Sequence, residues 1–400
     1  MSKLLLGINE RPKSYAQWGV LSLQHVFAMF GATVLVPILT GLSISVALLA
    51  SGIGTLIYIA FTKAKVPVYL GSSFAYIAAI SVASQSFGPE AAFVGLMVVG
   101  LIYVLVAQII RFAGKAWLDT ILPPVVIGPM IAIIGITLAS VATGQAGLSP
   151  NSADEFFAFL ASDPMHAVIA FVSFATTVGL AVFAKGFFKI VPILGGIVVG
   201  YIFAAVTGYV DFTALEGAPI LSLPDVTLFG TYVLDFGAIL MFAPIAFVTI
   251  AEHIGDHTVL GSITDKNFLQ DPGLENTLMG DGVATLVSAM LGGPANTTYG
   301  ENTGVVGMTK VGSVYVTGGA AVIAIILSFF NIFTTLISTI PAPVMGGVLI
   351  LLFGLIAGNG LKVMIEKKVD LTNMKNIIIV SAMLVIGLGQ AEIMINNASS

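Results

Sequence analysis

Three acidic residues lie in stretches of the sequence that are otherwise apolar. Glu252 and Asp256 are four positions apart in the run 249–257, so on a helix both carboxyl groups project from one face. Glu301 follows Gly300 in a short segment rich in small and hydroxyl residues. If these stretches lie in a membrane, such acids are by default functional and face a polar cavity. Burial and a second nearby carboxyl both favour the protonated form, so we expect these acids to exchange protons.

Each acid also has a structural interpretation that does not involve function. Asp256 could sit in water at the inner end of its helix, and Glu252 and Glu301 could accept hydrogen bonds from backbone amides. Asp281 lies between two glycines early in an apolar span, so we expect it to serve the N-terminal end of that helix.

The histidines near these acids give weaker signals. His253 and His257 have the i, i+4 spacing of a metal pair, but no third ligand and no HExxH order accompanies them, so we expect no metal site. His25 follows Gln24 in the first apolar span, where it could orient a neighbour or the substrate, or be a neutral core histidine.

The composition places these residues in a membrane protein. Among 400 residues, 57% are hydrophobic and 9% are charged, and the mean hydropathy is +1.04, whereas a soluble domain has about 25% charged residues. The chain has no cysteine, which excludes disulfides and thiol catalysis. It also has no nucleophile–base pairing, metal cluster or Walker loop, so we expect neither an enzyme nor the use of ATP.

Apolar runs long enough to cross a bilayer recur along the chain. We expect such spans at 16–39, 42–62, 90–113, 117–142, 165–184, 187–208, 233–254, 275–292, 312–332, 339–358 and 372–390. Two shorter segments, 66–84 and 294–311, bring the total to thirteen crossings, and we expect no cleavable signal peptide. With the N-terminus inside, all 15 lysines and arginines fall on the inner side. This pattern predicts a multi-pass protein of the cytoplasmic (inner) membrane with a cytoplasmic N-terminus.

The two halves of the chain resemble each other. The run 122–128, which contains Pro-Pro-Val and ends in glycine, reappears in similar form at 340–346, a shift of 340 − 122 = 218 positions. Seven crossings before residue 208 would invert the second copy, as in secondary transporters. We therefore expect an all-α polytopic fold with a seven-plus-seven inverted repeat whose last helix is missing from the 400 residues.

The two short segments occupy corresponding places in the two halves. Each opens with a proline and a β-favouring stretch, then turns to a brief apolar run. We expect extended strands that meet at mid-membrane, each followed by a half-helix that points its partial positive charge at a cavity. Ser72 or Ser73 is expected to cap the first half-helix, and Thr298 or Asn302 to lie near the start of the second. Such paired, interrupted segments point to a transporter's binding site.

Several motifs of the chain resemble those of a known family. The run from Glu301 to Lys310 fits the signature of the nucleobase–ascorbate transporter family, which is an acid or Gln, Asn, any residue, Gly, four residues, Thr, then a basic residue or Gly. The pair Gln24-His25, the run 72–74 and the run 251–255 match other landmarks, over about residues 15–392. The run 296–300 and the leading Glu301 resemble the bacterial uracil permeases within that family.

The resemblance implies a division into domains and a set of site residues. A core domain would comprise 15–115 and 232–335, and a gate domain that mediates homodimerisation would comprise 116–210 and 336–400. The substrate-binding residues implied are Glu252, Glu301, Phe74, Gly300, Tyr299 and Ser73. The proton-coupling residues implied are Glu252, Asp256, Glu301 and His25. Uracil permeases often have His where this chain has Asp256, which is a departure from the pattern.

The function implied is proton-coupled uptake of uracil by alternating access, with protons as the coupling ion and no other cofactor. The expected partners are a nucleobase and the lipid bilayer, with no nucleic acid. A xanthine or other nucleobase symporter, and an anion transporter of the same fold, are the alternatives. Two acids in the cavity argue against an anion substrate.

Overall fold

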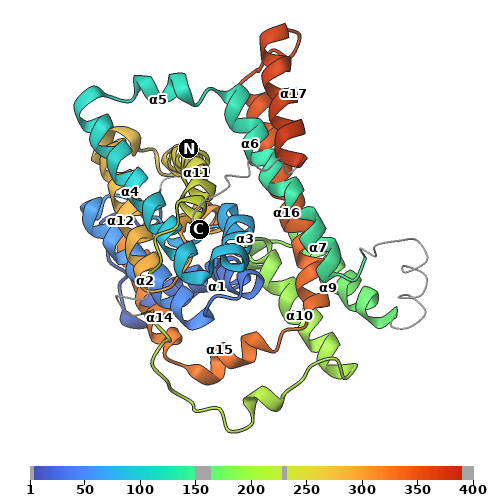
Figure 1. Cartoon of the computed structure of the whole chain (residues 1–400). Coiled ribbons are helices and arrows are strands. Elements are labelled where there is room, and N and C mark those ends of the chain that lie inside the picture. Colours follow the sequence, from blue (N-terminus) through green and yellow to red (C-terminus); the bar gives the residue numbers. More distant parts are fainter. Residues whose placement is uncertain (1–3, 149–163, 228–231, 390–400) are drawn as a thin grey trace. The chain divides into compact units, whose positions relative to one another are not determined.

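The described residues fold almost entirely into helices (Figure 1), and they include two short strands. A computed structural model describes residues 4–148, 164–227 and 232–389. The end of the expected gate domain, 390–400, lies outside the described residues. The first half of the chain contains α1 (Tyr15–Thr40), α2 (Ile44–Phe61), β1 (Leu70–Ser72), η1 (Phe74–Tyr76), α3 (Ile77–Phe87), α4 (Pro89–Ala113), α5 (Ala116–Ile121), α6 (Pro124–Thr137), α7 (Ala139–Gln145), α9 (Pro164–Phe183), η2 (Gly186–Lys189) and α10 (Pro192–Val206).

The second half begins with the same order of elements. It contains η3 (Thr213–Leu215), α11 (Phe236–Thr264), η4 (Leu269–Gly273), α12 (Leu274–Met290), β2 (Asn296–Thr298), α13 (Gly300–Thr309), α14 (Val314–Ser328), α15 (Asn331–Ser338), α16 (Ala342–Glu366) and α17 (Met374–Leu388). The sequence helix, helix, strand, short helix, helix therefore occurs twice, as the internal repeat predicts.

Within the described residues, seven helices are long and apolar enough to cross a membrane. An eighth candidate is the pair α14 and α15, which bend by 83° at a short break. Three further apolar helices are shorter, and one of them, Phe74–Phe87, overlaps the short segment expected at 66–84. The span expected at 312–332 is thus a bent pair of helices, with its break after Ser328.

The long helices begin and end at residues suited to those positions. The Ser14 hydroxyl accepts a hydrogen bond from Gln17 N at 3.2 Å, and α1 ends at Gly41, whose φ of +74° is left-handed. Asp235 Oδ1 accepts from Ala238 N at 2.9 Å at the start of α11. This helix runs to Thr264, ten residues beyond the expected end.

The helices divide between two compact units. The first comprises residues up to 114 and 176–341, and the second comprises 115–175 and residues from 342 onward. Residues 176–210, which the family resemblance places in a gate domain, therefore cluster with α1–α4. Within the second unit α16 packs against α6 and α7, and α17 packs against α6.

Close backbone approach holds the first unit together. Helix α12 packs against α4 and α2, and α14 packs against α2 and α1. A Cβ atom at Gly100 would fall 2.7 Å from the Gly282 carbonyl oxygen, so only glycine permits this approach of α4 to α12. Small residues at helix contacts are typical of membrane proteins, where packing rather than water exclusion drives association.

Candidate functional site

The two short strands pair with each other inside the first unit. β1 and β2 are antiparallel, with Leu70 opposite Thr298 and Ser72 opposite Asn296. Backbone hydrogen bonds continue on both sides, from Ser73 N to Ala295 O at 2.9 Å and from Tyr299 N to Tyr69 O at 3.1 Å. The pairing satisfies backbone groups that would be costly to leave bare in lipid. The two extended pieces therefore pair with each other, and their position at mid-membrane stays a prediction.

Tyr299 fastens the strand pair to α1. Its hydroxyl donates to Ser72 O at 2.9 Å and accepts from Thr33 Oγ1 at 3.2 Å. The ring lies over Gly71, where an added Cβ would be 2.5 Å from two ring carbons. Glycine at position 71 thus gives the aromatic ring its place against the strand.

Each strand leads directly into a short helix, as the sequence predicts. Ser73 and Tyr299 hold the N-cap positions of η1 and α13 with extended backbone, but neither side chain caps its helix. The prediction that Ser72 or Ser73 caps the first half-helix was wrong. The Ser72 hydroxyl donates to Thr33 O instead, and Ser73 Oγ is buried with no hydrogen-bond partner among the described residues. Helix starts without side-chain caps leave N–H groups for an external acceptor.

The three acids gather around the start of α13. Helix α11, which bears Glu252 and Asp256, packs against α13, β2 and η1, and the charges of both residues interact with that of Glu301. The Glu252 side chain is exposed, while Asp256 and Glu301 are half-buried. Asp256 accepts a hydrogen bond from the Thr298 hydroxyl at the end of β2. Asp256 lies within α11 rather than at its end, so that alternative was wrong.

An adjacent, buried face of α11 carries a polar cluster. His253 Nδ1 lies 2.8 Å from Asp281 Oδ2, and both side chains are fully buried. His257 Nδ1 bonds to the His253 carbonyl at 2.7 Å, and its Nε2 bonds to the Tyr58 hydroxyl. The two imidazoles stack at 4.1 Å between centroids. Asp281 therefore does not serve the start of its helix, since it sits at mid-helix in α12 and pairs with α11 instead.

His25 is held at the other side of α13. The Asn302 amide donates to His25 Nδ1 at 3.1 Å and to the His25 carbonyl at 3.0 Å. The described hydrogen bonds of His25 therefore go to Asn302 and to none of the three acids. Phe74 is half-buried and packs against the hydrophobic cluster that contains Tyr299. Among the described residues no group of three or more His, Asp or Glu has metal-binding geometry.

The structure thus joins most of the expected residues through elements of one unit. Glu252, Asp256 and Glu301 come together on α11 and α13, and the strand ends bring Ser73, Phe74, Tyr299 and Gly300 to the starts of the two short helices. The sequence interpretation missed Thr298 as a partner of Asp256. The available signal was the hydroxyl of Thr298, which lies in a β-favouring run directly before the start of a short helix.

The architecture matches a known fold. The transmembrane domain of a cyanobacterial bicarbonate transporter, BicA, superposes with a TM-score of 0.68 at 17% identity, covering 96% of this chain and 97% of that one. Murine Slc26a9, an anion transporter in the inward-facing state, gives a TM-score of 0.69 at 13% identity, over 95% and 66%. The fold is therefore that of polytopic transporters built on a seven-plus-seven inverted repeat.

Sequence comparison then gives the family. A model of the Permease family matches residues 16–395. The uracil permease of Bacillus caldolyticus is 47% identical over 100% of this chain and 91% of its own length. The uracil permease of Escherichia coli strain K12 is 42% identical over 100% and 90%. The chain belongs to this permease family, the nucleobase–ascorbate transporters.

Proposed function

We propose that the protein carries uracil across the cytoplasmic membrane together with a proton, by alternating access. The observation that supports this most directly is the meeting of Glu252, Asp256 and Glu301 beside the uncapped start of α13. The 42–47% identity to uracil permeases over nearly the full chain favours uracil over other substrates. Anion carriers share only 13–17% identity, so their likeness extends to the fold alone.

The chemistry of the site suits a neutral pyrimidine. Uracil presents two ring N–H donors and two carbonyl acceptors, and carboxylates accept while backbone N–H groups donate. Glu301 and Glu252 would accept from the ring N–H groups, and the backbone at Gly300 would donate to a carbonyl. The partly exposed ring of Phe74 offers a face for the base.

The same arrangement supports proton coupling. Three carboxylates grouped in a membrane-embedded site repel one another, and a proton bound among them lowers that cost. Asp256 is tied to the strand pair through Thr298, so a change of its charge acts directly on the strand crossing. Entry of the proton with the substrate would then let the core domain move against the gate domain. We also propose that the N-terminus lies in the cytoplasm and that the protein forms a homodimer through the gate domain. Light scattering in detergent would test whether the protein is a dimer.

The test is uptake of labelled uracil into proteoliposomes, with and without an inward proton gradient. Wild-type protein should accumulate uracil only with the gradient, and unlabelled xanthine should compete poorly. Glu301→Gln should lower uptake about tenfold or more, because a hydrogen bond to a charged group contributes ~1.5–3 kcal/mol. Glu216→Gln, in an exposed loop, is the matched control and should behave as wild type. Equal accumulation without the gradient would refute coupling, and wild-type uptake by Glu301→Gln would refute the site.

A further inference from the structure

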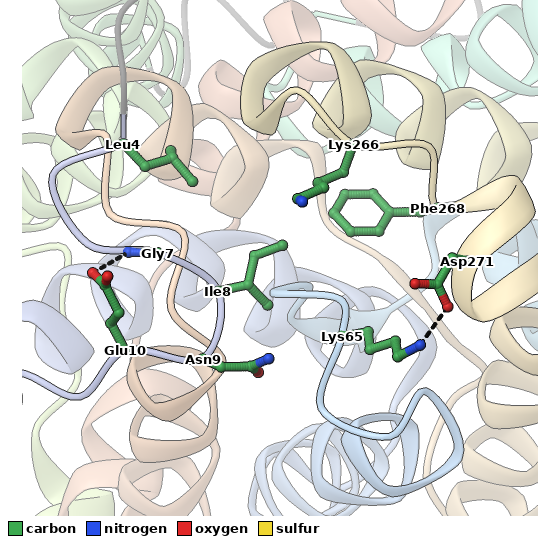
Figure 2. Close-up of a pocket in the computed structure, with 9 residues that line it drawn as sticks. All are labelled: Leu4, Gly7, Ile8, Asn9, Glu10, Lys65, Lys266, Phe268 and Asp271. Carbon is green, nitrogen blue, oxygen red and sulfur yellow. Dashed lines mark hydrogen bonds and ion pairs between the residues drawn. The ribbon is translucent and has the colours of Figure 1, made fainter.

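A pocket that Glu252, Asp256 and Glu301 do not line lies at the end of the first unit where α2 and α11 terminate. Its volume is about 440 Å³. Figure 2 shows its lining, in which the side chain of Lys266 extends between Leu4 and Phe268 and the amide of Asn9 faces it from the other side. The distribution of lysines predicts this end of the unit to be cytoplasmic.

The N-terminal segment forms one wall of this pocket and is firmly held. Leu5 N donates to Lys310 O at 2.8 Å, Gly312 N donates to Leu6 O at 2.9 Å, and Val314 N donates to Ile8 O at 2.9 Å. These bonds fasten the segment to the chain that follows α13. The wall is therefore ordered before any ligand arrives, which lowers the entropic cost of binding.

The carboxylates of the pocket are already engaged. Asp271 forms an ion pair with Lys65 at 2.5 Å. Glu10 accepts a hydrogen bond from Gly7 N at 2.8 Å and turns toward that backbone, away from Lys266 (Figure 2). Within the part of the chain that the structure describes, neither acid forms an ion pair with Lys266.

The side-chain donors of Lys266 and Asn9, by contrast, are exposed to solvent. Within the described residues no hydrogen bond or ion pair involves the Lys266 ammonium, the Asn9 side-chain amide, or the backbone N–H groups of Ile8 and Asn9. Lys266, Ile8 and Asn9 all line this pocket, and an ammonium group together with neutral N–H donors suits an anion with several acceptor oxygens.

We propose that this pocket binds a phosphate group, through Lys266 and the donors of Ile8 and Asn9. The group could belong to the headgroup of an anionic lipid, since basic pockets at the cytoplasmic ends of membrane helices bind such headgroups. It could equally belong to a soluble phosphate. The proposal concerns binding alone and is independent of the transported substrate.

The test measures ligand binding to the purified full-length protein in detergent, by calorimetry. The probes are inorganic phosphate and phosphatidylglycerol, with phosphatidylcholine as the reference lipid. Binding of phosphatidylglycerol alone assigns a lipid headgroup, and binding of inorganic phosphate assigns a soluble source. Lys266→Gln should weaken binding of the active probe about tenfold, as expected for the loss of one charge-assisted hydrogen bond.

Two further variants make the result decisive. Lys63→Gln changes an exposed lysine on the adjoining loop that does not line the pocket, and it should bind as wild type does. Asn9→Asp places a negative charge in the pocket and should weaken binding even if Lys266→Gln fails to fold. The proposal is overturned if wild type binds neither probe above the phosphatidylcholine background. It is equally overturned if the folded Lys266 and Asn9 variants both retain wild-type affinity.

Discussion

The contact between Gly71 and the Tyr299 ring allows a prediction to be worked out in detail. In Gly71→Ala the new Cβ would lie 2.5 Å from two ring carbons and 2.7 Å from the hydroxyl. Ordinary contact needs at least about 3.4 Å, so the ring must retreat by roughly 1 Å. Overpacking of this kind costs about 1–3 kcal/mol.

The retreat of the ring also disturbs its hydrogen bonds. The hydroxyl contacts to Ser72 O at 2.9 Å and Thr33 at 3.2 Å leave little room for a shift of that size. Losing them adds about 1 kcal/mol each. We therefore expect Gly71→Ala to lower the free energy of unfolding by about 3–5 kcal/mol, and to reduce uptake because the strand crossing is displaced.

The assay is unfolding in detergent followed by fluorescence, combined with uptake into proteoliposomes. Gly19→Ala is the matched control, since a Cβ there would meet nothing within 4 Å. A double-mutant cycle with Tyr299→Leu isolates the clash, because leucine lacks the contacting ring atoms. The cost of Gly71→Ala should fall markedly in that background. Additive effects in the cycle, or an unchanged stability of Gly71→Ala, would refute the reasoning.

Two other predictions follow from the buried pair and from the orientation. Asp281→Leu leaves His253 Nδ1 buried without its partner and should lower the free energy of unfolding by about 3–5 kcal/mol. Asp281→Asn keeps an acceptor for His253 and should lower it by less. Equal losses of unfolding free energy for the two variants in detergent would contradict this prediction. Because the chain has no cysteine, Lys13→Cys creates a single thiol. An impermeant maleimide should label that thiol only after intact cells are opened, and labelling of intact cells would reverse the orientation.

The sequence was informative wherever a local pattern determined the structure. Apolar length predicted the helices, and the proline-led, β-favouring runs predicted the strands, because both properties depend on residues close together in the chain. The strand residues Ser72 and Thr298 lay where expected, yet their hydrogen bonds went to Thr33 and Asp256. Side-chain partners far away in sequence depend on packing that a local pattern does not specify.

The position of Asp281 and the end of α11 also could not be predicted from local sequence patterns. The hydropathy of α11 falls at its polar residues, which suggested an end near residue 254, but the helix continues because His253 and His257 find buried partners on α12 and α2. The partner of Asp281 is 28 residues away, and glycines on both sides of it suggested a helix start. Whether a polar residue ends a helix or lies within it depends on whether a neighbouring helix offers it a hydrogen-bond partner.

The strand crossing has a consequence for biosynthesis. Ser72 and Tyr299, joined across it, are separated by 227 residues. During translation β1 enters the bilayer long before β2 has been synthesised. Until then the backbone amides of β1 must form hydrogen bonds with other partners, such as water or the insertion machinery. The first half of the chain therefore cannot complete its fold until the second half has been synthesised. A ribosome stalled between the two would leave an intermediate in which the edge of β1 is unpaired.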